Sequence, residues 1–443
     1  MPKGLRKVAV SFGDSTLTHY GGMILFQQFC RKLDLKRLFQ RHVAWRRRDG
    51  PYHGSEMLLC LLYTMVAGLK RISDTRILSY NRSFQNLLGL GRFPSETTLR
   101  GFLKGISREE LKGIMKVHDL LREKMCALPR PRTSFILDED STVLPLYGWT
   151  IQGARVGYNP KKPRRPSYHP LVCFDGVTQD TIHGMLRPGD THPASASIRF
   201  SRQCLAKLPT YTNRKRVTVR ARADAGFYDK KFIRFLEGEK VGYVVVAKMT
   251  SPLRSKATGL RYRTFRKQGK WQAGQTTYQP QGWKYPRRFV VVRRPKPKRK
   301  EEELQLTLWK FKDFFYHAFV TILKLRPPAV WRFYKGRANV ELDIRELKDA
   351  LPLGQIPTTR FTANAAHFEL VMLAYDLVNW FRRLCLTGQW QKARLTTLRR
   401  EVFMLPARLL NVGRRNVLKL PADYPHQKRF LKAQTQIRKL RIP

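Results

Sequence analysis

Acidic residues are scarce in this chain. Its 443 residues include 32 Asp and Glu against 86 Lys and Arg, a formal net charge of +54 at pH 7. Self-repulsion on that scale destabilises a compact fold unless a polyanion neutralises it. Because 42% of the residues are hydrophobic, the chain can still bury cores and is not a disordered basic tail. The basic residues are spread over the whole length, with peaks at Arg46–Arg48, Lys161–Arg165 and Arg293–Lys300, which indicates an extended nucleic-acid footprint.

Several sequence features of other protein classes are also missing. The six cysteines form no CxxC pair and have no histidine cluster beside them, so we expect reduced core thiols and neither a disulfide framework nor a zinc site. No apolar run approaches twenty residues, and Met1–Asp14 lacks the apolar core of a signal peptide. There is no P-loop, which argues against a nucleotide cofactor. These absences predict a cytoplasmic protein that does not contact the membrane.

The first part of the chain, residues 1–130, reads as an all-α domain. Apolar residues recur at helical spacing in Gly22–Leu33, Glu56–Leu69, Asp74–Leu88 and Glu96–Met115. Ser95 is a good N-cap for the last of these helices. The segment Thr97–Arg100 that follows is predicted to lie across a DNA groove or backbone, the alternative being a helical bundle that only packs on the next domain.

The pattern changes after Pro131. Strands are predicted at Ser134–Tyr147, Tyr168–Phe174 and Thr181–Leu186, then a helix at Ala194–Leu208, a strand at Arg216–Ala223, a helix at Asp229–Gly238 and a strand at Val241–Ala247. This order matches the mixed sheet of ribonuclease-H-like folds, so we predict a mixed α/β catalytic domain over residues 131–386. A basic helical region is expected over residues 387–443.

Acidic residues stand at particular points of this pattern. Asp138 and Asp140 point to one face of their strand and Glu139 to the other, while Asp224 closes a later strand. On a helix spanning Trp331–Ala350, the spacing of Tyr334, Arg337, Glu341 and Lys348 places all four on one stripe. Two strand aspartates and a helix glutamate can form an all-oxygen site for Mg²⁺. The alternatives are a solvated helix with i,i+4 ion pairs of Glu341, and aspartates that only cap turns.

Together these residues resemble a known family. Asp140–Thr142, Ala223–Tyr228 and the helix with Tyr334, Arg337, Glu341 and Lys348 are similar to the three acidic motifs of bacterial DDE transposases of the insertion-sequence-four superfamily. The segments 157–161, 167–171, 186–192, 337–341 and 361–364 resemble its insertion-sequence thirteen-eighty branch. The resemblance runs from about Thr18 to near the C-terminus.

The resemblance implies a ribonuclease-H-like DNA transposase that cuts the inverted-repeat ends of its element and joins the freed 3′-hydroxyls to target DNA. Asp140, Asp224 and Glu341 would be the catalytic residues and the ligands of two Mg²⁺ ions, with Mn²⁺ as a substitute, and Asp138 is the rival for the first position. Tyr334, Arg337 and Lys348 would bind DNA phosphates. The family also implies a homodimer in the synaptic complex with double-stranded DNA, in the bacterial nucleoid.

A β-rich insertion separates the second aspartate from the glutamate in this superfamily. Here Glu341 lies 117 positions after Asp224, and residues 249–323 of this interval are rich in aromatic and basic residues. Trp271, Trp283 and Trp309 are candidates for stacking on a flipped base, or for packing the insertion's own core. Two alternative functions remain open, a domesticated or inactive DNA-binding protein and a ribonuclease-H-like nuclease without strand transfer.

Overall fold

The computed structural model describes most of the chain. The described residues are 10–45, 51–157, 159, 162–191, 196–209, 217–266, 270–296, 309–311, 314–413 and 415–443. Parts of the predicted motifs and basic peaks lie outside these ranges. These parts are Arg46–Arg48, most of segment 157–161, and residues 192 and 297–300. All six residues of the predicted site lie inside them.

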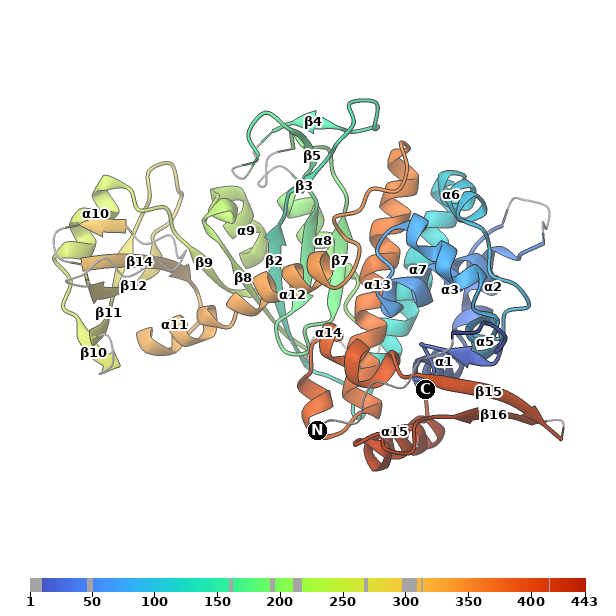
Figure 1. The fold of residues 1–443 in the computed structure, drawn as a ribbon. Helices are drawn as coiled ribbons and strands as arrows, with labels where there is room; N and C mark the ends of the chain where they lie inside the picture. The colour runs from blue at the N-terminus through green and yellow to red at the C-terminus, as the bar shows by residue number, and fades with distance from the viewer. Residues whose placement is uncertain are drawn as a thin grey trace, which may run out of the picture.

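A large mixed sheet forms the centre of the molecule (Figure 1). Among the described residues it has ten strands in the order β10-β11-β12-β14-β9-β8-β2-β6-β7, with β13 paired to β14. Strand β2 runs parallel to β8 and β8 parallel to β9, whereas β6 is antiparallel to β2 and β7 is antiparallel to β6. The bounds in this half are β2 (Ser134–Ser141), β6 (Leu171–Asp175), β7 (Thr181–Met185), β8 (Thr218–Ala223) and β9 (Gly242–Val246).

The predicted β-rich insertion extends this sheet along one edge. After α10 (Ser251–Thr258), the strands β10 (Arg263–Arg266), β11 (Trp271–Tyr278), β12 (Arg287–Pro295), β13 (Trp309–Phe311) and β14 (Phe314–Thr321) follow as an antiparallel set. Strand β14 pairs with β9, so the insertion shares backbone hydrogen bonds with the other half of the sheet.

Helices cover both faces of the sheet, because apolar side chains alternate along its strands. Tyr243 and Val245 belong to the core on the side of α8 (Ser197–Ala206), α9 (Lys230–Gly238) and α10. Val244 and Val246 belong to the core under α11 (Pro327–Lys335). The sheet therefore lies between two helical layers, and the second layer also contains α12 (Ala338–Asp349) and α13 (Phe361–Cys385).

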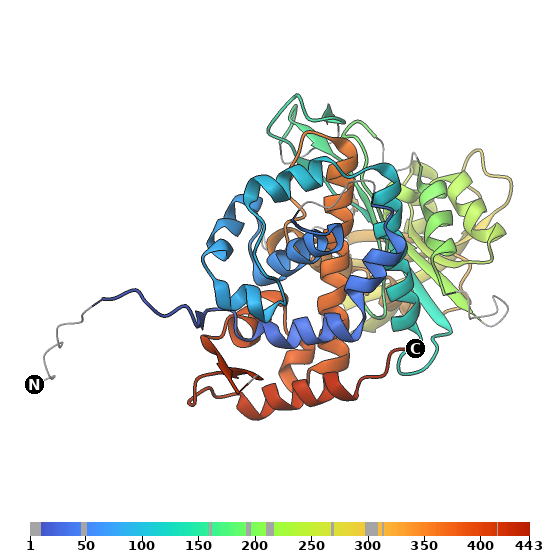
Figure 2. The ribbon, with the colours of Figure 1, turned by 90° about the vertical axis from the view of Figure 1, so that its right-hand side faces the viewer.

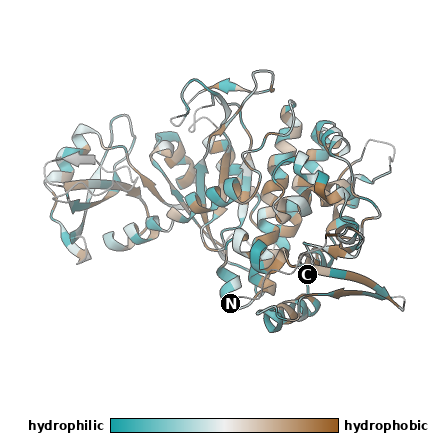
Figure 3. Ribbon diagram, in the orientation of Figure 1, coloured by the Kyte–Doolittle hydropathy of each residue, from teal (hydrophilic) through white to brown (hydrophobic). Residues whose placement is uncertain are grey.

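Helix α13 joins the N-terminal helices to the sheet (Figure 2). Its buried side chains share one hydrophobic core with helices of the N-terminal region and with Val172 and Phe174 of β6. Brown, apolar residues follow α13 through the molecule in Figure 3. No helix in the described part of the chain is long and apolar enough to cross a membrane. The N-terminal helices are α1 (Met23–Lys32), α2 (Leu35–His42), α3 (Gly54–Ala67), α4 (Arg76–Ser79), α5 (Arg82–Leu87), α6 (Glu96–Lys104) and α7 (Arg108–Cys126).

Two of the predicted helices are interrupted. The expected helix Glu96–Met115 ends at Lys104, and α7 begins after Ser107, whose hydroxyl accepts from the Glu110 N–H while the Glu110 carboxylate accepts from the Ser107 N–H. This reciprocal capping starts a new helix in another direction. The expected helix Asp74–Leu88 is broken between α4 and α5, where Asn81 caps the second piece.

The expectation of a helical region after residue 386 is only partly correct. Helices α14 (Leu395–Leu398) and α15 (Gln427–Lys439) flank a β-hairpin of β15 (Ala407–Val412) and β16 (Arg415–Lys419), and β1 (Leu17–Thr18) pairs with β15. Gly413 has a φ of +54° at the turn, a conformation that other residues rarely adopt. Leu409 and Leu418 pack against the main core, so burial of this hairpin outweighs the helical pattern.

Candidate active site

Asp140 and Asp224 lie at the same edge of the sheet. Asp140 is near the carboxyl end of β2, and Asp224 directly follows β8, the parallel neighbour of β2. Parallel neighbours end at one edge, so two residues that are 84 positions apart come together. One oxygen of Asp224 accepts the Gly226 N–H at 2.8 Å and caps the short helix Ala225–Phe227, as the simpler interpretation predicts. Its other oxygen is left for the site.

The Arg337 guanidinium connects the two aspartates. Its Nη2 lies 3.1 Å from Asp140 Oδ1 and 3.7 Å from Asp224 Oδ2, and it donates to the Glu139 carbonyl oxygen at 3.2 Å. Burial opposes the charged form of Arg337, but the negative charges of Asp140 and Asp224 raise its pKa above the ordinary value. Arg337 therefore stays a cation and offsets the repulsion between the two carboxylates.

Asp140 is the more enclosed of the two carboxylates. Its side chain is 14% exposed, against 43% for Asp224. Burial raises the pKa of Asp140, Arg337 opposes this rise, and the charges of Asp224 and Glu341 add to it. Asp224 and Glu341 thus both act electrostatically on Asp140, and a bound cation would offset that repulsion.

Glu341 lies in a helix that is shorter than predicted. The expected helix Trp331–Ala350 is divided into α11 and α12 at Gly336, so the single four-residue stripe is wrong. At this joint the N–H groups of Gly336 and Arg337 donate to carbonyl groups three residues back, which tightens the turn. Arg337 turns inward to the aspartates, and no ion pair joins the exposed Glu341 to Arg337 or Arg345, all three being described residues. The interpretation as a solvated helix with such pairs is therefore wrong.

Asp138 is already paired in a different way. It is fully buried, and both of its oxygens accept from Arg222, one of them at 2.6 Å from Nε. Arg222 also donates to the Phe333 carbonyl oxygen at 2.8 Å, which ties the end of α11 to β8. A Cβ on Gly336 would lie 2.2 Å from Arg222 Nη1, so the joint between α11 and α12 needs glycine for this close approach. Sequence reasoning missed Arg222, because its partner is 84 positions away on the neighbouring strand.

Tyr334 and Lys348 support the site from within. The Tyr334 ring packs on Phe319 with centroids 4.8 Å apart, and burial raises its pKa to about 12. Lys348 Nζ donates to Thr142 Oγ1 at 2.5 Å and to the Val143 carbonyl oxygen at 3.1 Å. Lys348 thereby holds the chain that leaves β2 just after Asp140.

The carboxylates fit a hard divalent cation in their chemistry. They offer oxygen atoms only, and Asp224 and Glu341 are open to solvent, which suits an ion that keeps water ligands. They do not form a closed ligand cage, because the one described group of three ligand atoms within 4.8 Å of one another is Glu139, Cys173 and Cys204. That group is buried on the opposite face of the sheet, and Ser201 donates to Glu139 at 2.6 Å.

The comparison with protein families decides the assignment. The model of the transposase DDE domain group 1 matches residues 1–442. The chain belongs to the DDE transposase family. No curated protein matches the sequence. Among solved structures, a piggyBac transposase synaptic complex with hairpin DNA is similar at a TM-score of 0.42 and 12% identity, covering 87% of this chain and 80% of that one.

The tryptophans of the transposase insertion are packed against neighbours. The Trp271 ring lies 5.0 Å from that of Trp331, and the Trp283 ring stacks 5.5 Å from that of Tyr228. Both side chains are partly buried in the cores on either side of the sheet. Trp309 is in β13, and its side chain lies outside the described part of the chain. The packing alternative therefore accounts for Trp271 and Trp283.

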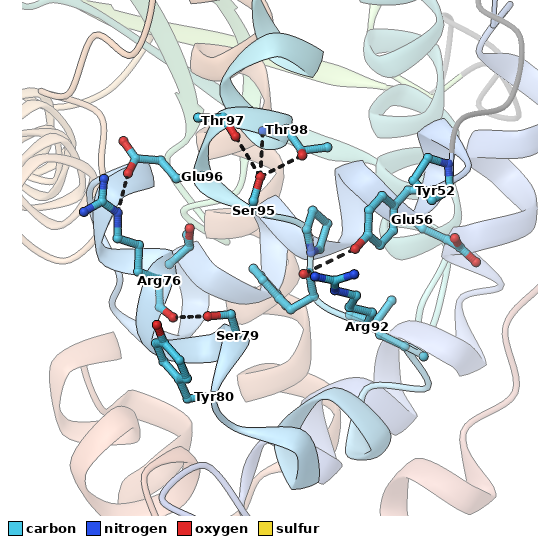
Figure 4. A pocket seen from close by; sticks show the side chains of 16 residues that line it. Tyr52, Glu56, Arg76, Ser79, Tyr80, Arg92, Ser95, Glu96, Thr97 and Thr98 are labelled. Atoms are coloured by element: carbon cyan, nitrogen blue, oxygen red, sulfur yellow. Dashed lines mark hydrogen bonds and ion pairs between the residues drawn. The ribbon is translucent and has the colours of Figure 1, made fainter.

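The N-terminal helices of the transposase contain a separate cavity of about 890 Å³ (Figure 4). Ser95 stands at its wall and, as predicted, caps α6 by accepting from the Thr98 N–H. Arg100 is used internally, because it donates to Glu96 and to the Pro357 carbonyl oxygen. None of the three site carboxylates lines this cavity.

All six cysteines are buried and free, as expected for core thiols. The close approach of Cys173 and Cys204 to Glu139 was not predicted, since the three are scattered in the sequence. Burial raises the pKa of Glu139 to about 7.

Proposed function

We propose that this chain is a DNA transposase that cleaves the inverted-repeat ends of its element and joins the freed 3′-hydroxyls to target DNA. Asp140, Asp224 and Glu341 would hold Mg²⁺. The observation that carries the proposal is the meeting of Asp140 and Asp224 on one Arg337 nitrogen at the edge of the sheet. Such an open acidic site stands out in a chain with a net charge of +54.

The strand order supports a ribonuclease-H-like core. In chain order, the first three strands β2, β6 and β7 form an antiparallel set, and the next two, β8 and β9, add in parallel on the other side of β2. This is the arrangement expected for that fold, with a catalytic acid on the first and fourth strands. The domain limits at residues 130 and 386 remain part of the proposal.

The side chains have separate roles in the proposed mechanism. Bound Mg²⁺ ions would supply activation of the attacking oxygen and stabilisation of the leaving oxygen of a phosphodiester. Arg337 holds Asp140 and Asp224 side by side and provides positive charge next to the scissile phosphate. Lys348 fixes the segment after Asp140 through Thr142 and Val143, and Tyr334 fixes the end of α11. Catalysis of this kind rests on positioning and electrostatics.

The proposed partners are the element ends, target DNA and a second copy of the chain in the synaptic complex. The excess of basic residues supports a long contact with DNA phosphates. The logarithm of the binding constant should therefore fall with the logarithm of salt concentration by about 0.9 per phosphate neutralised. A flat salt response would contradict an extended footprint.

The direct test compares the wild type with Glu341→Gln on a labelled duplex that carries the element end and flanking DNA, with Mg²⁺. We expect both proteins to bind and only the wild type to cut, leaving a 3′-hydroxyl at the element end. Equal cleavage by the two proteins would show that Glu341 is misassigned. Products that join an end oligonucleotide to a target plasmid would separate a transposase from a nuclease without strand transfer.

A further inference from the structure

A small sheet beside the proposed active site carries two exposed aromatic residues. It consists of β3 (Leu144–Pro145), β4 (Arg155–Val156) and β5 (Pro166–Tyr168), and it stands at the top of Figure 1. In the loop between β3 and β4, Tyr147 is 78% and Trp149 is 71% exposed. Two large aromatic side chains are thus exposed two residues apart in one loop.

Basic side chains surround these aromatics. Lys162 Nζ donates to the Tyr147 hydroxyl at 2.9 Å, and the Arg165 guanidinium lies 4.8 Å from the centre of the Tyr147 ring. Tyr147, Trp149, Arg164 and Arg165 line a cavity of about 330 Å³. The Tyr147 ring is thus in contact with cations. Among the described residues, no aromatic ring or cation contacts the Trp149 ring. Its indole face remains available.

The position of this surface follows from the chain. Asp140 is near the end of β2, and Lys348 holds Thr142 and Val143 just before β3 begins. Trp149 is nine residues beyond Asp140, so even a fully extended chain would separate their Cα atoms by no more than about 30 Å. A DNA strand in the active site can therefore reach Trp149 within a few nucleotides.

We propose that Trp149, with Lys162 and Arg165, binds unpaired nucleotides of the DNA strand next to the cleavage site. An open indole face binds an unstacked base, which a paired duplex does not offer, and nearby cations bind the phosphates on either side. None of the described residues that line the cavity is acidic, which favours a polyanion over a basic partner. The inference rests on the proposed function, since it takes DNA at the carboxylate site as given.

The experiment measures binding without cleavage. The full chain is titrated in EDTA, by fluorescence anisotropy, with two duplexes of the same end sequence, one blunt and one with a short single-stranded extension. We expect the wild type to prefer the extended duplex. Trp149→Ala should reduce its affinity for that duplex by about 5- to 150-fold, with little change for the blunt duplex, and Trp149→Phe should keep most of the preference.

Tyr285→Ala is the matched control, because Tyr285 is 53% exposed and also lies beside basic residues, Lys284 and Arg287. It should leave the preference unchanged. An equal loss on both duplexes for Trp149→Ala, or no loss, would overturn the inference. Because this assay does not depend on cutting, its failure is distinct from failure of the Glu341→Gln test, and a thermal melt checks that each variant is folded.

Discussion

Two aspartates of β2, Asp138 and Asp140, each pair with an arginine from another element, and the two pairs differ in how open they are. Arg222 and Asp138 form a closed pair, because both carboxylate oxygens are used and Asp138 is fully buried. Arg337 and Asp140 form an open pair, because one nitrogen is shared with the more exposed Asp224. A closed pair leaves no oxygen for a ligand, whereas an open pair keeps a carboxylate available. The comparison shows why position on a strand alone did not separate Asp138 from Asp140.

The surroundings of the two pairs explain the difference. Asp138 pairs in register with Arg222 across β2 and β8, under the joint of α11 and α12. Asp140 is further along β2, beyond the paired part of β8, where the sheet opens to solvent. The closed pair therefore holds the second helical layer in place, and the open pair is left free to act chemically.

Neutralising each aspartate should separate the two roles most clearly. Asp140→Asn is expected to reduce the cleavage rate by about 10³-fold or more. This loss is larger than the one usually caused by removing a single group that stabilises the transition state electrostatically. The same variant should change thermal stability less than Asp138→Asn does, because Arg337 keeps Asp224 and the Glu139 carbonyl oxygen as partners. Asp138→Asn should instead lower the free energy of unfolding by about 3–5 kcal/mol, since Arg222 is left buried without its partner.

Cleavage of a labelled element end and thermal unfolding, measured on the same preparations, test this pair of variants. Asp138→Asn protein that remains folded should still cut at a rate near that of the wild type. If Asp138→Asn abolished cutting without loss of stability, Asp138 would take the first ligand position in place of Asp140.

Arginine-to-lysine changes test the open pair with a smaller expected loss of cleavage. Arg337→Lys keeps the positive charge but loses the planar guanidinium that contacts two carboxylates and the Glu139 carbonyl group. We expect cleavage to fall by about 10–100-fold, the usual effect of disturbing a residue that orients metal ligands. DNA affinity, measured by anisotropy, should change little.

Arg222→Lys is the matched control for that change. It should reduce stability through its lost bonds to Asp138 and Phe333 and should spare the cleavage rate of the folded protein. A stronger loss of cleavage for Arg222→Lys than for Arg337→Lys would reverse the roles given to the two arginines.

Much of the fold follows from local patterns in the sequence. Apolar patterns and helical spacing predict β7, β8, β9 and α9 to within two residues, whereas the predicted strand Ser134–Tyr147 is too long, because β2 ends at Ser141 and β3 is a separate strand. The predicted helix Glu96–Met115 is too long, because Ser107 and Glu110 are compatible with a helix interior as well as with a cap. The C-terminal hairpin was missed because its short strands gain stability from the core beneath them.

The site was less predictable than the fold. Position and spacing predict Asp140, Asp224 and Glu341 as the candidate ligands, but the inward turn of Arg337 depends on Gly336 and on Arg222 beneath it. A glycine inside a helical pattern was the available signal for that break. The pairing of Asp138 with Arg222 needs the register of two parallel strands, which a single sequence does not contain.

A third group of ionisable side chains is buried between α7 and α13, away from the edge of the sheet that carries Asp140 and Asp224. His118 of α7 contacts Glu369 at 2.7 Å and Asp376 at 2.8 Å on α13, and it is fully buried. Burial and Arg122 lower the pKa of His118, but the two carboxylates outweigh them and raise it above 6.5. A raised pKa stabilises the folded protein fully below the unfolded value of about 6.5 and less as pH rises through the folded value.

We therefore expect stability to fall above pH 6.5, by up to about 1.4 kcal/mol for each pH unit between the two pKa values of His118. His183, His317 and His367 have pKa values lowered to about 4 by burial, so their contributions change only below pH 6.5. Urea unfolding of the wild type and His118→Gln between pH 6.5 and 9 isolates the effect, because the variant should lack this slope. Equal slopes would mean that His118 is neutral in the folded protein, in which case it contacts Glu369 and Asp376 through hydrogen bonds without an ion pair.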